Sequence, residues 1–258
     1  ILKEIKKKQD KYGSSLTGKG KKIVVELSSP NIAKPFGIGH LRSTIIGNAL
    51  AKIARYQGYK VITINYLGDW GTPFGKLIAG YKEFGSLQKL KKDPAGHLYE
   101  IYVKVSADSA YEEKGRQWFK KLEEGNKEAL KYWELFRKET IEGFSKIYRF
   151  LNVKFDVTSG EARYNNKISK VMKLLQKKKL LEESEGAQII NLENYGLGVC
   201  LMAKSDGTTL YATRDIAAAL DRYKLYKFKK MFYEVGAEQK LHFKQVFKVL
   251  ELIGLKWS

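Results

Sequence analysis

The most constraining feature of this sequence is a strand–loop–helix–strand pattern close to its start. Residues 23–27 (IVVEL) form a short apolar run suited to a buried strand, and residues 61–66 (VITINY) form a β-branched run bounded by Gly58 and Gly68. Between them, apolar residues recur at helical spacing over residues 41–54. Two parallel strands joined by a crossover helix are a βαβ unit, so the pattern predicts an α/β fold with a parallel sheet.

The character of the chain changes twice after this unit. From about residue 86, long charged helical segments replace the glycines and β-branched residues, and strand and helix patterns alternate again from residue 186. The later patterns predict a helix over residues 215–225, a strand over 231–235 and a helix over 241–253. We therefore predict four regions: the end of an N-terminal domain or a linker at 1–22, the first half of the α/β domain at 23–85, a mainly helical insertion at 86–185, and the second half of the domain at 186–258.

Charge and cysteine content narrow the class of partner. The 258 residues include 48 Lys and Arg against 28 Asp and Glu, which gives a formal net charge of +20. A field of that sign, without an amphipathic basic anchor, favours nucleic acid over a membrane. The single cysteine, Cys200, cannot close an intrachain disulfide, and no Cys/His cluster has zinc spacing. We expect a cytoplasmic protein with no metal site and no membrane contact, and the sequence identifies no protein partner.

A glycine-containing turn, PFGIGH at residues 35–40, joins the first predicted strand to its helix. Backbone N–H groups in such a turn, together with the positive end of the helix, can receive a phosphate group. The turn is not a Walker loop, and it fails the dinucleotide fingerprint because Arg42 stands where the third glycine belongs. Plain turn geometry, with His40 as a surface or capping residue, is the alternative interpretation.

Several sequence blocks occur together in a fixed order. They are SSPNIAKPF at 28–36 with GHLRST at 39–44, NYLGDWG at 65–71, KSDGTTLYATRD at 204–215, and Gln239 with LHFKQ at 241–245. In this order the blocks resemble arginyl-tRNA synthetases, which are class I aminoacyl-tRNA synthetases, and the bacterial type most of all. The resemblance implies a Rossmann-like nucleotide-binding catalytic domain. It also implies ATP-dependent activation of L-arginine and its transfer to tRNA(Arg) through arginyl-adenylate.

The resemblance further implies an arginine pocket. A guanidinium group has five donors, so its site needs a carboxylate and neutral acceptors. By resemblance, Tyr211, Asp215 and Gln239 line this pocket, with Asp215 on the guanidinium, while Glu26 and Asn31 help to hold the substrate. The alternatives are a helix N-cap for Asp215, a core aromatic for Tyr211, a strand-edge salt bridge for Glu26, and satisfied turn or helix-start amides for Asn31 and Gln239.

The resemblance also implies an ATP site. Gly39 and His40 match the second half of the class I signature and are expected to act in catalysis together with Lys34, which reaches a phosphate. Gly37 and His242 complete the expected ATP-binding residues, and Mg²⁺ accompanies ATP without a protein cage. The alternatives are an exposed loop lysine for Lys34 and a surface helix residue for His242. Adenylate formation requires positioning and charge neutralisation, not a covalent nucleophile.

The sequence departs from the family pattern at Gly37, where the signature has its first histidine. The change removes a donor from developing negative charge, a loss typically worth about 2 to 4 kcal/mol of transition-state stabilisation. The chain also opens on Ile1 and ends before the second family signature, so we expect a piece of a longer protein. A catalytically silent RNA-binding module is therefore the alternative function. An intact pocket of Tyr211, Asp215 and Gln239 favours the enzyme.

Overall fold

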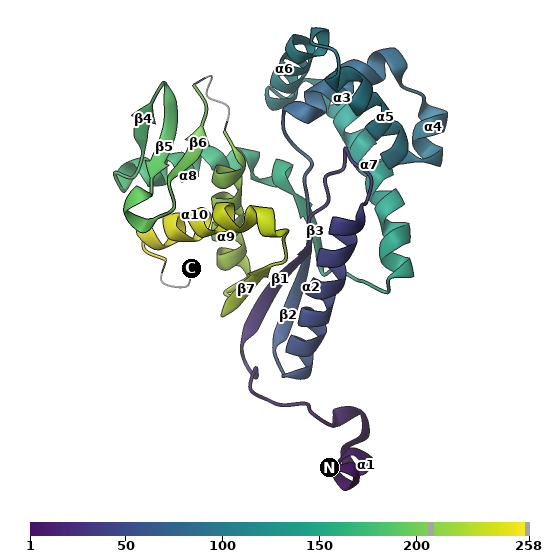
Figure 1. The fold of residues 1–258 in the computed structure, drawn as a ribbon, viewed down its shortest axis with the longest axis vertical. Helices are drawn as coiled ribbons and strands as arrows, with labels where there is room; N and C mark the ends of the chain where they lie inside the picture. Colours follow the sequence, from purple (N-terminus) through teal and green to yellow (C-terminus); the bar gives the residue numbers. More distant parts are fainter. Residues whose placement is uncertain (206–208, 256–258) are drawn as a thin grey trace. The chain divides into compact units, whose positions relative to one another are not determined.

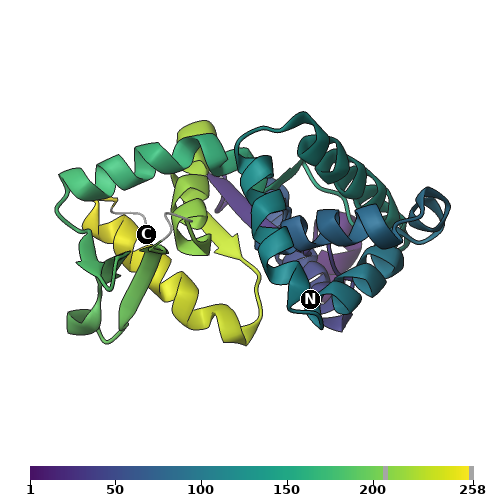
Figure 2. The same cartoon turned by 90° about the horizontal axis from the view of Figure 1, so that it is seen from above.

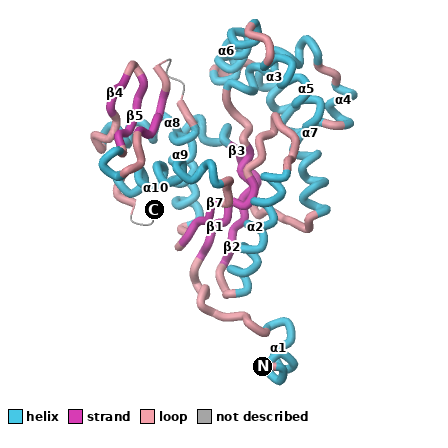
Figure 3. Tube along the Cα trace, in the orientation of Figure 1, coloured by secondary structure: helices cyan, strands magenta, loops and turns pink. Residues whose placement is uncertain are grey.

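The computed structural model describes residues 1–205 and 209–255, and this part of the chain has a mixed α/β fold (Figure 1). The strands are β1 (Lys22–Ser28), β2 (Lys60–Leu67), β3 (Val157–Gly160), β4 (Glu182–Ser184), β5 (Ala187–Asn191), β6 (Val199–Ala203) and β7 (Lys230–Tyr233). The α-helices are α1 (Leu2–Lys8), α2 (Ile38–Tyr56), α3 (Thr72–Phe84), α4 (Leu87–Lys92), α5 (Pro94–Ser106), α6 (Ala110–Glu123), α7 (Lys127–Phe150), α8 (Ile168–Lys177), α9 (Tyr211–Tyr226) and α10 (Lys240–Leu252). Helices alone occupy the chain from α3 to α7, whereas strands and helices alternate on either side (Figure 3).

The strands form two sheets. Four strands make one sheet in the order β3-β2-β1-β7, and the other three make an antiparallel sheet in the order β4-β5-β6. Strand β1 pairs in parallel with β7, in a register that puts Glu26 beside Tyr233. A parallel strand inside a sheet is buried on both faces, which explains the apolar run at residues 23–27. The predicted α/β fold with a parallel sheet is confirmed.

The predicted βαβ unit corresponds to β1, α2 and β2. Helix α2 begins at Ile38. The apolar periodicity starts only at residue 41, because the first turn of the helix contains no buried side chain. The helix predicted over residues 215–225 also begins earlier, at Tyr211. Asp215 therefore lies one turn inside α9, and the N-cap position belongs to Leu210. The N-cap interpretation of Asp215 is wrong.

The chain divides into two compact units. Unit 1 comprises Ile1–Leu27, Ile46–Ile64 and Arg163–Ser258, and unit 2 comprises Ser28–Ile45 and Asn65–Ala162. In unit 1, α9 packs against α8, α10 and β6. The region boundaries that we predict at residues 22, 85 and 185 remain predictions.

Helices α3, α5, α6 and α7 of unit 2 pack around a common apolar core (Figure 2). Leu77 and Ile78 of α3 and Phe136 and Phe144 of α7 are among its buried members. Helices α3 and α6 approach so closely that a Cβ atom added at Gly75 would overlap the carbonyl oxygen of Gly115. Only glycine fits at that position, because any side chain there would meet backbone. Along the described part of the chain, no helix has the length and apolarity needed to cross a membrane.

Candidate functional site

Asp215 and His242 are the two predicted site residues whose side chains contact each other. Asp215 lies in the second turn of α9 and His242 in the first turn of α10, and the packing of these helices brings Oδ2 of Asp215 to 2.7 Å from Nε2 of His242. The side chain of Asp215 is 16% exposed and that of His242 is 28% exposed, so the pair is reachable from solvent. We predicted Asp215 for arginine and His242 for ATP, and in the structure they are hydrogen-bonding partners.

Glu26 lies in β1, which has β2 on one side and β7 on the other, and only 3% of its surface is exposed. Its Oε2 atom is 2.6 Å from Nη1 of Arg222 in α9. Burial, and to a smaller degree the charge of Asp215, raises the pKa of Glu26 to about 7, and Arg222 opposes this rise. The alternative of a strand-edge salt bridge is wrong in its location, because the ion pair is inside the fold.

Tyr211 and Gln239 stand at helix starts. Tyr211 is the first residue of α9, one turn before Asp215, and it is 55% exposed, so the core-aromatic interpretation is wrong. Because residues four apart share a helix face, Tyr211 and Asp215 point to the same side of α9. Gln239 occupies the N-cap position of α10, is exposed, and makes no side-chain cap hydrogen bond. Its side-chain amide is not committed to capping and is accessible to a ligand.

Asn31 and Lys34 belong to unit 2 and follow β1. The Oδ1 atom of Asn31 accepts a hydrogen bond of 2.8 Å from the backbone N–H of Ala33, and its backbone forms a parallel bridge with Gly68. Asn31 is therefore a turn amide, as the alternative interpretation states for it. Lys34 is exposed on the same loop.

The glycine turn at the start of α2 contains Gly37, Gly39 and His40. The backbone N–H of Gly37 donates to Nδ1 of His40 at 3.2 Å, which requires the tautomer with its proton on Nε2. The imidazole packs beside Phe36, with ring centroids 5.5 Å apart. Burial, together with the nearby charge of Lys34, lowers the pKa of His40, so the ring is neutral at pH 7. A Cβ atom at Gly37 or Gly39 would meet no atom within 4 Å, so the turn is open above both glycines.

Sequence reasoning missed Arg222, which contacts the buried carboxylate of Glu26, and Tyr233, which lies beside Glu26 in the sheet. Arg222 follows Asp215 by seven residues, a spacing of two turns that places both on one face of α9. That spacing was the available signal. Residues 206–208 of the block at 204–215 lie outside the described residues.

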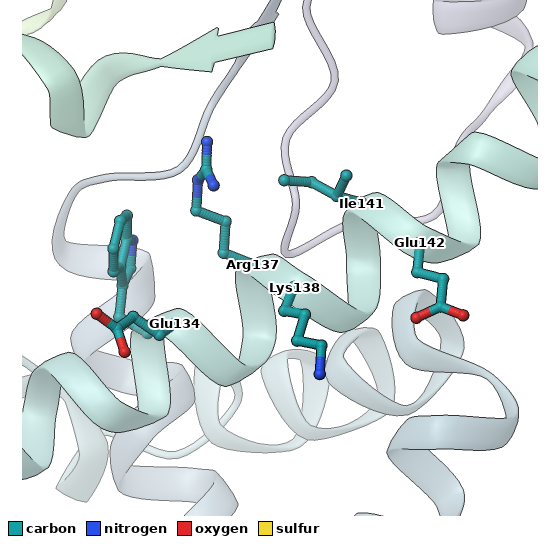
Figure 4. A pocket seen from close by; sticks show the side chains of 6 residues that line it. Glu134, Arg137, Lys138, Ile141 and Glu142 are labelled. Atoms are coloured by element: carbon teal, nitrogen blue, oxygen red, sulfur yellow. The ribbon is translucent and has the colours of Figure 1, made fainter.

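A shallow hollow of about 570 Å³ lies along α7 in unit 2. The residues that line it are Trp133, Glu134, Arg137, Lys138, Ile141 and Glu142. Figure 4 shows Arg137 and Lys138 leaving α7 in different directions. Nε of Arg137 is 2.9 Å from Oδ2 of Asp69, a carboxylate that is 1% exposed. None of the residues that we predicted from the sequence lines this hollow. In residues 1–205 and 209–255, no three His, Cys, Asp or Glu side chains are grouped to hold a metal ion.

The comparisons with known proteins agree with one another. Residues 2–257 match the family described as class I tRNA synthetases (R), catalytic domain. The chain is 51% identical to arginine–tRNA ligase 2 of Bacillus anthracis, with 100% of this chain and 46% of that protein aligned. It is also 51% identical to the arginine–tRNA ligase of Clostridium kluyveri, over the same shares of the two chains. The chain thus spans about half the length of these relatives.

Solved structures show the same likeness. The crystal structure of arginyl-tRNA synthetase from Plasmodium falciparum superposes with a TM-score of 0.77 at 27% identity, covering 95% of this chain and 42% of that one. The arginyl-tRNA synthetase of Thermus thermophilus superposes with a TM-score of 0.67 at 20% identity, covering 94% of this chain and 47% of that one. The second likeness shows the fold alone.

Proposed function

Because the chain belongs to the family of class I arginyl-tRNA synthetase catalytic domains, we propose that it activates L-arginine with ATP and transfers it to tRNA(Arg) through arginyl-adenylate. The observation that carries the proposal is the family match over residues 2–257. The relatives bear enzyme names, which favours catalysis over a silent RNA-binding module. The net charge of +20 supports tRNA as a partner, and we place the reaction in the cytoplasm.

Asp215 is the residue that we assign to the substrate guanidinium. Its Oδ2 atom already forms a hydrogen bond of 2.7 Å with Nε2 of His242. The planar fork of an arginine side chain offers five N–H donors and full charge, so it competes well for this carboxylate. Tyr211 supplies an exposed phenol on the same face of α9, and Gln239 supplies an amide that caps no helix. Glu26 adds a second carboxylate, and Asn31 offers the remaining donors of its amide.

We assign ATP to the turn that opens α2. Its backbone N–H groups, the open space above Gly37 and Gly39, and the exposed Lys34 suit a polyphosphate. Neutral His40 presents its Nε2–H as a donor, since Nδ1 accepts from Gly37. His242 is the ATP candidate of α10. In the reaction, an arginine carboxylate oxygen bonds to the α-phosphorus while the bond to pyrophosphate breaks, so these groups act by orienting the phosphates and offsetting their charge.

Mg²⁺ would accompany ATP on the phosphate oxygens. The described carboxylates are not grouped to hold a metal ion. We further propose the division into a linker at 1–22, two halves of the catalytic domain at 23–85 and 186–258, and a helical insertion at 86–185. The run of helices from α3 to α7 supports the insertion.

The proposal is tested by arginine-dependent exchange of pyrophosphate into ATP, measured with full-length protein in the presence of tRNA. Exchange with arginine, and none with lysine or citrulline, is the expected result, because citrulline lacks the guanidinium charge. Arginine binding without exchange would favour the silent module. A stably folded protein that binds no arginine in calorimetry would overturn the proposal.

A further inference from the structure

We propose that Arg222 is a positioning residue of the arginine site, whose guanidinium fixes the Glu26 carboxylate in place and favours its negatively charged form for the substrate. This inference rests on the proposed function, since it deepens the account of the same pocket. Arg222 is not one of the residues that the sequence blocks assign to a substrate.

Arg222 and Glu26 form a buried ion pair, in which each charge depends on the other. Arg222 is the largest of the fully buried side chains, and the two side chains are 2% and 3% exposed. The 2.6 Å contact between Nη1 and Oε2 supplies the opposite charge that an ionised carboxylate needs away from water. Removing one partner of such a pair leaves the other as a lone buried charge, which favours its neutral form.

Two tyrosines complete the enclosure of the guanidinium. Tyr233 of β7 lies beside Glu26 in the sheet, and the Arg222 guanidinium carbon lies 5.9 Å from the Tyr233 ring centroid. The guanidinium of Arg222 also acts electrostatically on the phenols of Tyr233 and Tyr164, and burial raises the pKa of both phenols, so they stay neutral. Because the planar guanidinium of Arg222 has partners on several sides, it is held in one orientation. Its contact with Glu26 then fixes the position of that carboxylate.

The charges around Glu26 explain why a countercharge is needed. Burial raises the pKa of Glu26 to about 7, Asp215 adds to the rise, and Arg222 opposes it. The other titratable groups that face this cluster are Tyr233 of β7, Tyr164, and His242, which pairs with Asp215. At neutral pH, Glu26 is thus close to half-protonation, and Arg222 is the group that favours its charged form.

The test measures arginine affinity by calorimetry between about pH 6 and about pH 9 in full-length protein, for the parent, Arg222→Met and Arg222→Lys. Affinity rises with pH as Glu26 ionises. Without Arg222 the midpoint of that rise should move upward by about one pH unit or more, and affinity at pH 7 should fall about tenfold. Arg222→Lys retains the charge without the fork, so it should recover part of the shift.

Arg137→Met is the matched control. It also breaks an ion pair with a buried carboxylate, that of Asp69, but the pair does not include Glu26. It should lower thermal stability and leave the midpoint for arginine unchanged. The double variant Glu26→Gln/Arg222→Met should bind arginine weakly and without dependence on pH in this range, which keeps the test decisive where Arg222→Met alone does not fold.

The two proposals fail in different ways. An Arg222→Met protein that is less stable but has the parent's midpoint would overturn the positioning role and leave the proposed function intact. A double variant with the parent's affinity and pH dependence would overturn it as well. A parent protein that binds no arginine at any pH would overturn the function itself.

Discussion

Asp215 and His242 are hydrogen-bonded to each other: Oδ2 of Asp215 is 2.7 Å from Nε2 of His242, where α9 packs against α10. A carboxylate proposed for the substrate is therefore partnered before any substrate arrives. To displace His242, the substrate arginine must bind the Asp215 carboxylate more strongly than His242 does. Its five N–H donors and permanent positive charge meet that requirement. The same contact positions His242 at the start of α10, beside the proposed arginine site.

Substituting Asp215→Asn should weaken arginine binding by about tenfold to a hundredfold and ATP binding far less, because a charge-assisted bond is replaced by a neutral one. Isothermal calorimetry with each ligand measures both effects. Asp221→Asn is a matched control, since Asp221 lies on the same helix and pairs with Lys167. Equal arginine affinity for the Asp215→Asn and parent proteins would remove Asp215 from the pocket.

Glu26 should make the protein less stable as pH rises from about 4.5 to about 7. Its pKa is raised from 4.5 to about 7 in the folded state, so the folded protein holds a proton in this window that the unfolded chain has lost. The contribution is at most about 3 kcal/mol, and above about pH 7 it changes no further. Urea unfolding of the parent and of Glu26→Gln measures it, and the difference in unfolding free energy between them should vary across this window. A constant difference would contradict the shifted pKa.

Gly37→His should raise the rate of adenylate formation by roughly tenfold or more, because it restores a donor where negative charge develops. The space above Gly37 accepts a side chain, as no atom lies within 4 Å of an added Cβ. Pyrophosphate exchange with tRNA present measures the rate, and Gly37→Ala is the control for the added side chain alone. An equal gain with alanine would show that stiffening of the turn, not the imidazole, is responsible.

Binding of tRNA should weaken steeply as salt concentration rises, because lysines and arginines that neutralise phosphates release condensed counterions. The net charge of +20 makes this electrostatic contribution to binding large. A fluorescence titration of tRNA(Arg) from low to physiological salt gives the slope. Affinity independent of salt would remove the electrostatic basis for tRNA as a partner.

The sequence alone predicts those parts of the fold that depend on local pattern. The apolar run of β1 and the β-branched run of β2 identify the βαβ unit without further help. The start of α9 is harder, because Tyr211 is exposed and the buried residues that follow it include the polar Thr213 and Arg214, which do not extend an apolar pattern. The seven-residue spacing places Arg222 on the same face of α9 as Asp215. It could not predict the contact of Arg222 with Glu26, since that contact depends on where α9 lies relative to β1.

The candidate site, like the fold, is only partly predictable from the sequence. The sequence blocks identify Asp215, His242 and His40 as individual residues. The blocks do not predict that Asp215 and His242 form a hydrogen bond with each other. Nor do they predict that Nδ1 of His40 accepts a hydrogen bond from the backbone N–H of Gly37. Hydrogen-bond partners and burial are properties of the folded chain, and both bear directly on which proton each group carries.

The close crossing of α3 and α6 leaves no room for a side chain at Gly75, where the backbones of the two helices approach each other directly. The salt link of Lys76 to Glu112 spans the same crossing. A single methyl group at Gly75 would therefore force the two helices apart and disturb the core that they share.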